Sequence, residues 1–312
     1  MVKIGVLGSS RLGLPALQTL LHNGVPVSLV MPSKASEQTD QLEHMARSYG
    51  LVPLKVENQN LKHQLTDWLS REKPELVVVL TFPYIIPSEI LDKGGVPWFN
   101  FHYAPLPEYR GAEPTFWQLR NQEKEGAVTV HQLTENLDAG PIVFSDPVAI
   151  APDDTHGMYI TKLAYSGAAS LVKLINLWEE RGAEIPLQPQ DEAKAKTYPR
   201  ATARDLIIQW DEMKARDIKA LVNAANPWNK GAIAFLEGKP LRISAVSIEE
   251  GTPSGNRKAG RLEVDADGSL RINTHENLDL VVDVLAVEEG IYTGKDFARY
   301  YQPDNKILSA NF

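Results

Sequence analysis

Three polar residues near the middle of the chain carry side chains that complement one another chemically. Asn100 and His102 stand two residues apart, and Asp138 follows in the run Leu-Asp-Ala-Gly. An amide can donate a hydrogen bond to an oxyanion, an imidazole can move a proton, and a carboxylate can orient the imidazole. Acyl transfer to an amine requires all three of these functions. The set therefore predicts a site for acyl-group transfer.

Each of these residues also has a purely structural interpretation. Asn-x-His on a strand can simply pack, and Asp-Ala-Gly is typical of a turn. Alternate residues on a strand share a face, so Asn100 and His102 project together if residues 97–102 form a strand. The loop that follows is stiffened by Pro105 and Pro107, which suits a ligand clamp whose shape is set before the ligand arrives. Together these features favour the catalytic interpretation.

The elements that position the pair are predicted from hydrophobic patterning. Short apolar runs alternate with helix-like segments in the first half of the chain, which predicts an α/β fold with a doubly wound, mostly parallel, Rossmann-like sheet. Ligands bind such sheets outside the carboxyl ends of the strands, where the strand order switches. Asn100 and His102 lie at such an end. The expected strands cover residues 2–7, 27–31, 51–56, 75–80 and 97–102, and the expected helices cover residues 13–21, 38–49 and 60–71.

The loop of Asp138 lies between two further apolar runs. Residues 129–133 and 142–150 are expected to form a hairpin-like pair around this loop, and residues 155–179 a long helix. Residues 181–204 contain several prolines and many polar residues, which is typical of a loop.

These features divide the chain into two expected domains. The first covers residues 1–183, a linker covers residues 184–204, and the second covers residues 205–312. After a helix at about residues 212–224, the second domain alternates short strands with turn signals, among them residues 251–255. This pattern predicts a small β-barrel or sandwich.

The composition excludes several kinds of site and disfavours some partners. The chain has 312 residues, a formal net charge of −8 and no cysteine, which rules out a disulfide framework, thiol catalysis and thiolate metal sites. The negative charge disfavours a nucleic-acid partner, because such proteins neutralise phosphates with Lys and Arg. No apolar run could span a bilayer and the start does not fit a signal peptide, so we expect no membrane partner and a cytoplasmic location. The histidines lack metal-ligand spacing and residues 8–13 do not fit Gly-x-Gly-x-x-Gly, so we expect neither a metal nor a dinucleotide.

An ordered set of motifs resembles the 10-formyltetrahydrofolate-dependent formyltransferases. The likeness extends over nearly the whole chain, and Thr197-Tyr198 and Asn226-Pro227-Trp228 are similar to the junction and the start of the C-terminal barrel in the methionyl-tRNA type. The resemblance thus implies an OB-like barrel for the second domain. The central motifs are Asn100-x-His102, Leu106-Pro107-x-Tyr109-Arg110-Gly111, Gly126-x-x-Thr129-Val130 and Leu137-Asp138-Ala139-Gly140.

The resemblance implies a reaction and a role for each catalytic residue. A formyl group would pass from 10-formyltetrahydrofolate, the co-substrate, to a primary amine, with no metal. Asn100 would donate to the oxyanion, His102 would shuttle protons, and Asp138 would hold the imidazole and favour its protonated form. The residues implied to bind the folate are Phe82, Tyr84, Ile85, Ile86, Leu106, Pro107, Gly111, Thr134, Glu135, Asn136 and Leu137.

The amine acceptor is predicted from charge. Members that formylate tRNA carry a basic loop after the second strand and a basic C-terminal domain. Here residues 32–50 hold only Lys34 and Arg47 against three acidic residues, and residues 205–312 hold thirteen Lys or Arg against seventeen Asp or Glu. We therefore favour a small amine, such as an amino-sugar nucleotide or an aminoacyl group, over methionyl-tRNA, which stays the alternative.

Other functions remain open at this point. A formyltetrahydrofolate hydrolase would use the same three residues with water as the acceptor. A non-catalytic folate-binding or assembly module would need none of them. The C-terminal domain could bind the acceptor, form a homodimer or cap the first domain.

Overall fold

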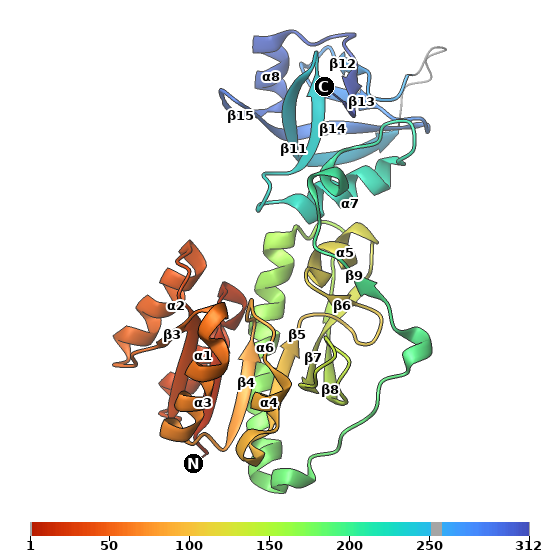
Figure 1. Cartoon of the computed structure of the whole chain (residues 1–312). Helices are drawn as coiled ribbons and strands as arrows, with labels where there is room; N and C mark the ends of the chain where they lie inside the picture. The colour runs from red at the N-terminus through yellow and green to blue at the C-terminus, as the bar shows by residue number, and fades with distance from the viewer. Residues whose placement is uncertain (1, 251–257, 312) are drawn as a thin grey trace. The chain divides into compact units, whose positions relative to one another are not determined.

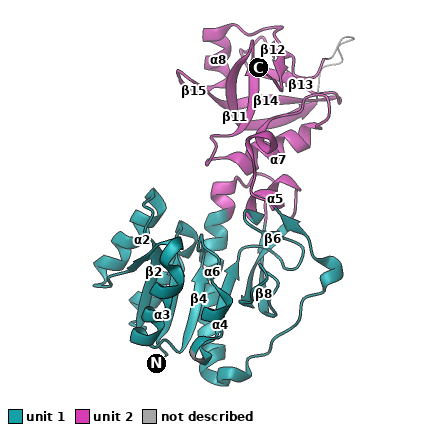
Figure 2. Cartoon of the chain, in the orientation of Figure 1, with its two compact units in different colours: residues 1–114, 125–149, 160–198 teal, residues 115–124, 150–159, 199–312 magenta. Residues whose placement is uncertain are grey.

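The structure is a computed structural model that describes residues 2–250 and 258–311. Contacts within the chain divide it into two compact units (Figure 2). The first unit takes residues 1–114, 125–149 and 160–198, and the second takes residues 115–124, 150–159 and 199–312. Residues 184–198, part of the expected linker, belong to the first unit by their contacts. The division into domains at residues 183 and 205 stays a proposal.

A mostly parallel sheet with helices packed around it forms the first unit (Figure 1). The strand order is β3-β2-β1-β4-β5-β7-β8; β1 to β5 pair in parallel, and β7 and β8 are antiparallel. The predicted doubly wound sheet is confirmed, and its order switches between β1 and β4, one strand from β5. The strands are β1 (Ile4–Gly8), β2 (Val27–Pro32), β3 (Leu54–Val56), β4 (Leu76–Leu80), β5 (Trp98–His102), β7 (Glu125–Gln132) and β8 (Ile142–Ala149).

The helices α1, α2, α3 and α6 follow the predicted pattern to within a few residues, whereas the short helices α4 and α5 were not predicted. They are α1 (Leu14–His22), α2 (Glu37–Ser48), α3 (Leu61–Glu72), α4 (Ser88–Leu91), α5 (Pro114–Arg120) and α6 (His156–Arg181). The side chain of Ser36 accepts a hydrogen bond from the backbone N–H of Thr39, which caps the start of α2.

The core explains why these runs become a buried sheet. All five residues of β4, Leu-Val-Val-Val-Leu, are buried, as expected of a parallel strand covered on both faces. Trp68 of α3 packs so closely on β1 that a Cβ atom at Gly5 would lie 2.5 Å from its ring. Only glycine therefore allows this helix to approach the strand.

The hairpin formed by β7 and β8 brings the loop of Asp138 to the end of β5. The two strands are antiparallel, as expected. Along β5, Asn100 pairs with His131 of β7 and His102 pairs with Thr129. The backbone N–H of Leu133, just past β7, donates to the carbonyl of Trp98 at 2.8 Å. Trp98 begins β5, so the loop starts beside the amino end of this strand, and it brings the Asp138 carboxylate to 3.5 Å from His102 at the carboxyl end.

Part of the expected linker is more ordered than a loop. The strand β9 (Thr197–Tyr198) pairs in parallel with β6 (Arg110–Gly111), which directly follows the proline-containing loop. Figure 1 shows this stretch, in green, running from the end of α6 back to β6.

A curled antiparallel sheet forms most of the second unit, in agreement with the expected β domain. Its order is β12-β13-β14-β11-β10-β16, and β15 pairs with β14. Two of its strands are longer than the short strands expected, and the turn signals at residues 251–255 lie outside the described residues. The elements are α7 (Ala215–Ala225), β10 (Ala232–Leu236), β11 (Lys239–Glu250), β12 (Leu262–Val264), β13 (Leu270–Asn273), β14 (Leu278–Val287), β15 (Gly290–Thr293), α8 (Gly294–Tyr301) and β16 (Leu308–Ser309). In residues 2–250 and 258–311, no helix combines the length and the apolar character needed to cross a membrane.

Candidate active site

The structure brings Asn100, His102 and Asp138 together. His102 Nδ1 lies 3.5 Å from Asp138 Oδ1, and both side chains are buried. Asn100 reaches the same carboxylate through His131: its Nδ2 lies 3.1 Å from His131 Nε2, which lies 3.8 Å from Asp138 Oδ1. The arrangement places an amide, two imidazoles and a carboxylate at the carboxyl end of β5.

His102 faces a hydrogen-bond acceptor on each side of its ring. Its Nε2 lies 2.6 Å from the carbonyl oxygen of Tyr109, and its Nδ1 faces the Asp138 carboxylate. Neither a carbonyl nor an ionised carboxylate can donate a hydrogen bond. Only a ring with a proton on each nitrogen can donate to both. The surroundings therefore suit a group that holds a proton and releases it.

His131 is a site residue that the sequence pattern missed. From the sequence, His131 is expected to be a packed residue of a strand. Only the register of β7 against β5 places it opposite Asn100. Its Nδ1 lies 3.0 Å from the carbonyl of Gln132. Burial, reinforced by the positive charge that His102 can carry, lowers the pKa of His131 to about 4, although Asp138 opposes the shift. His131 is thus neutral at neutral pH.

A neutral His131 fixes the orientation of the Asn100 amide. With the proton of His131 on Nδ1, its Nε2 is an acceptor and must receive a hydrogen bond from Asn100 Nδ2. An amide nitrogen carries two hydrogens, so the other N–H of Asn100 can donate to a developing oxyanion. This is the role predicted for Asn100.

Asp138 occupies a backbone conformation that side chains rarely adopt. Its φ is +52°, in the left-handed region. Its Oδ2 accepts a hydrogen bond of 2.9 Å from the backbone N–H of Gly111. A Cβ atom at Gly111 would lie 2.1 Å from the carbonyl oxygen of Tyr198, so only glycine fits there. Gly111 thus supports Asp138, and the predicted contact of Gly111 with folate stays a prediction.

The loops predicted to contact the folate expose apolar side chains. Ile85, after β4, is 78% exposed, and Leu137, after β7, is 62% exposed. Phe82, Tyr84 and Leu133 pack against one buried cluster, which joins the two loops. Apolar side chains held out to solvent on neighbouring loops suit the binding of a flat, partly apolar ring. Of the other predicted contacts, Ile86, Leu106 and Pro107 are buried, and Thr134, Glu135 and Asn136 are exposed.

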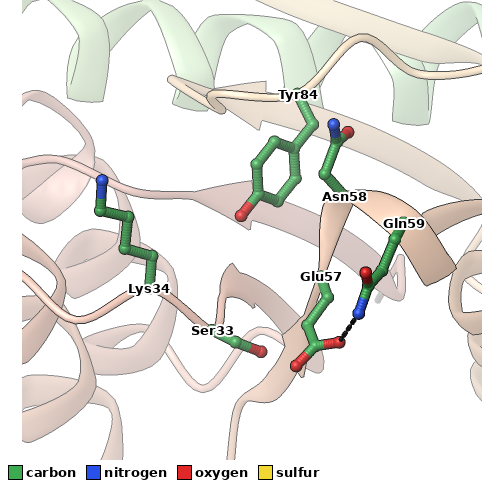
Figure 3. Close-up of a pocket in the computed structure, with 6 residues that line it drawn as sticks. All are labelled: Ser33, Lys34, Glu57, Asn58, Gln59 and Tyr84. Carbon is green, nitrogen blue, oxygen red and sulfur yellow. Dashed lines mark hydrogen bonds between the residues drawn. The ribbon is translucent and has the colours of Figure 1, made fainter.

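A polar pocket of about 590 Å³ lies past the ends of β2 and β3. Figure 3 shows the ring of Tyr84 turned into this pocket, and the amide of Gln59 donates to Glu57 at 3.0 Å. Of the residues predicted to bind folate, it includes Tyr84 alone. Its lining consists of Ser33, Lys34, Glu57, Asn58, Gln59 and Tyr84. Within the described ranges, no group of three His, Asp or Glu residues is placed to hold a metal ion.

Comparison with known proteins covers both units. Residues 10–175 match the family model described as formyl transferase, and residues 200–302 match the model of the formyl transferase C-terminal domain. A methionyl-tRNA formyltransferase of Geotalea uraniireducens is 31% identical over 323 residues, which cover 98% of each chain. One of Syntrophus aciditrophicus is 29% identical over 310 residues, covering 96% of each chain.

Solved structures share the fold at lower identity. The N-formyltransferase of Helicobacter canadensis, in complex with folinic acid and dTDP-3-aminofucose, has a TM-score of 0.68 and 16% identity over 94% of this chain and 100% of that chain. HypX of Aquifex aeolicus, in complex with tetrahydrofolic acid, has a TM-score of 0.67 and 16% identity over 95% of this chain. The chain spans about half the length of HypX, covering 47% of it.

Proposed function

The chain belongs to the formyltransferase family, and we propose that this folate-dependent enzyme formylates the amino group of methionyl-tRNA at Asn100, His102 and Asp138. The choice of methionyl-tRNA as the acceptor rests on similarity along the whole chain. Relatives named methionyl-tRNA formyltransferase match over 96% to 98% of the chain, and the C-terminal family model covers residues 200–302. The charge argument favours a small amine instead, and the full-length similarity outweighs it.

The geometry around His102 supports the chemical step. The acceptor amine attacks the formyl carbon, a C–N bond forms, and the carbonyl oxygen becomes an oxyanion. This oxyanion accepts a hydrogen bond from the Asn100 N–H that is not directed at His131. His102 donates its proton to N10 of the folate as the C–N10 bond breaks, and takes up the proton that the amine loses. The Asp138 carboxylate, 3.5 Å from His102 Nδ1, stabilises the protonated ring between these transfers.

Replacing His102 tests these roles. We expect His102→Ala to lower kcat for formyl transfer by roughly 100- to 10,000-fold, because both proton transfers lose their carrier. His63→Ala, at a histidine whose side chain is 83% exposed on α3, is the matched control and should behave as the wild type. Near-full activity of the His102 variant would remove His102 from the mechanism.

A small amine is the second candidate acceptor. Residues 205–312 carry thirteen basic against seventeen acidic residues, which is a poor surface for RNA. The Helicobacter canadensis relative, solved with dTDP-3-aminofucose, shows that this fold occurs with an amino-sugar nucleotide.

One assay separates the acceptors. The enzyme is incubated with 10-formyltetrahydrofolate and either methionyl-tRNA, amino-sugar nucleotides or buffer alone, and release of tetrahydrofolate is followed. The proposal expects release with methionyl-tRNA. Release only with an amino-sugar nucleotide would establish the second candidate instead. Equal release in buffer would identify a hydrolase, and no release in any arm would indicate a non-catalytic module.

A further inference from the structure

Residues 188–198, here called the return segment, lie against the loop that carries Asp138. The backbone of Gln188 exchanges two hydrogen bonds of 2.8 Å with Ile142, just past that loop. Farther on, β9 pairs with β6, and the rings of Tyr109 and Tyr198 stack with centroids 4.8 Å apart. The return segment therefore contacts both chain stretches that meet at His102: the loop of Asp138 and the loop that ends at Gly111.

Gln190 uses both ends of its side-chain amide at this place. Its Nε2 donates to the backbone carbonyls of Asp138 and Gly140, at 2.8 and 2.7 Å. Its Oε1 accepts from Arg110 Nε and Nη2, at 3.1 and 2.8 Å. A guanidinium can only donate, so Arg110 fixes which end of the amide faces which partner. Both N–H groups of Gln190 are thereby directed at the Asp138 loop.

Arg110 is itself held in place. It is 8% exposed, and its Nη1 and Nη2 donate to the two carboxylate oxygens of Glu192 at 3.0 and 2.7 Å. This two-point geometry is rigid as well as favourable. The hydrogen bonds from Arg110 lower the pKa of the exposed Glu192 carboxyl and so favour its charged form. Arg110 also precedes Gly111, whose N–H holds the Asp138 carboxylate.

We infer that Gln190, oriented by Arg110, is a positioning residue for Asp138. The left-handed conformation of Asp138 is unfavourable for a residue with a side chain, and the loop needs contacts that keep it there. Gln190 holds the carbonyl of Asp138, and Gly111 holds its carboxylate. Together they keep Oδ1 directed at His102. The inference rests on the proposed role of Asp138 in formyl transfer.

Two substitutions test the two ends of the amide. Gln190→Met removes all four hydrogen bonds with little change in size. Gln190→Glu keeps an acceptor for Arg110 but loses both donors to the Asp138 loop. We expect each to lower kcat by about 10- to 100-fold, because a small displacement of a reacting group has effects of this size. The KM for the folate should stay within about threefold, because Gln190 bonds to Arg110 and to the backbone of the Asp138 loop and is not among the residues proposed to bind the folate. The matched control is Gln18→Met, at an exposed glutamine on α1.

The pH profile separates positioning from simple stability. In Gln190→Met the basic limb of the kcat profile should move to lower pH, since a displaced carboxylate stabilises protonated His102 less. A loss of kcat with an unchanged profile and a parallel rise in KM would show a merely structural role. Wild-type kcat in Gln190→Glu would show that the two donors are dispensable. Either result overturns the inference.

Asp138→Asn, measured in the same assay, distinguishes the possible failures. If this variant keeps wild-type turnover, the proposed role of Asp138 is wrong. If it loses turnover while both Gln190 variants keep theirs, the proposed function stands and the inference about Gln190 is wrong. Should Gln190→Met not fold, Gln190→Glu alone decides, because it preserves the partner of Arg110.

Discussion

At the scale of single residues, the two histidines of the site have opposite tasks. Both side chains are buried, but His102 faces two acceptors and suits a proton carrier, whereas His131 donates through Nδ1 to a carbonyl and lies beside the Asn100 amide. The difference comes from their surroundings, because both rings lie near the same carboxylate. A pair of titratable groups whose environments differ in this way is typical of acid–base sites.

The buried His131 makes stability depend on pH. Its pKa of about 4 in the folded chain lies below the ordinary value of 6.5, so the unfolded chain binds more protons between these values. The neutral, buried His131 therefore contributes stability that is fully present above pH 6.5 and is lost as the pH drops toward 4.

The measurement is urea unfolding of the wild type and of His131→Gln across this pH range. The variant should lose less stability on acidification, because glutamine does not titrate there. Ionisable groups away from the site act equally in both proteins, so the difference between the two curves reports His131 together with His102 and Asp138, which interact with it. Parallel curves would contradict the assigned pKa shift.

At the scale of elements, the pairing of β6 with β9 depends on one glycine. Gly111 has a φ of +115°, and a Cβ atom there would lie 2.1 Å from the carbonyl of Tyr198. We expect Gly111→Ala to destabilise the fold by about 3 kcal/mol or more and to lower kcat, because the cost of the positive φ adds to the clash with the Tyr198 carbonyl. Urea unfolding and the formyl-transfer assay measure the two effects.

Gly24 supplies the matched control for this substitution. Its φ is +66°, but no heavy atom outside its chain neighbours lies within 4 Å of a Cβ built there. Gly24→Ala should therefore lower the free energy of unfolding only through the positive φ, by about 1 kcal/mol, and leave kcat unchanged. Equal losses in the two variants would mean that Tyr198 imposes no constraint on Gly111.

The elements that the sequence predicts well are those whose apolar residues form a continuous run or recur with the period of a helix. β4 is a continuous valine-rich run, and α6 has a long apolar side, so both positions follow from pattern alone. The proximity of Asn100, His102 and Asp138 also follows from strand alternation and from the hairpin around the loop. Their catalytic roles remain proposals.

What the sequence does not predict depends on side-chain contacts between distant segments. His131 becomes a site residue through the register of β7 against β5, which no local pattern specifies. The return segment is polar and contains proline, so it predicts a linker; its order comes from Gln190 and from its pairing with β6. Neither contact has a signature in spacing or hydrophobicity.

At the scale of the whole molecule, charge bears on how a tRNA could bind. Many basic residues of the second unit already pair with acidic ones, which leaves less positive charge for phosphates. Such pairs include Lys219 with Asp153, Arg271 with Asp265 and Glu249, Lys295 with Asp267, Arg299 with Asp296, and Lys306 with Glu237.

We therefore expect a shallow dependence of tRNA formylation on salt. The logarithm of kcat/KM should fall with the logarithm of salt concentration with a slope of about −1 to −3, corresponding to few phosphate contacts. Initial rates with methionyl-tRNA at several concentrations of potassium chloride measure this slope. A slope steeper than about −5 would require a basic surface that the charge count does not provide.

The return segment also sets the order in which the site is completed during synthesis. Asn100, His102 and Asp138 are all synthesised before α6, whereas Gln190 and β9 follow that helix. A nascent chain that ends at residue 183 thus contains every proposed catalytic group and lacks the hydrogen bonds that Gln190 donates to the Asp138 loop. The contacts of Gln190 and of β9 can therefore form only after the polypeptide has grown past Tyr198.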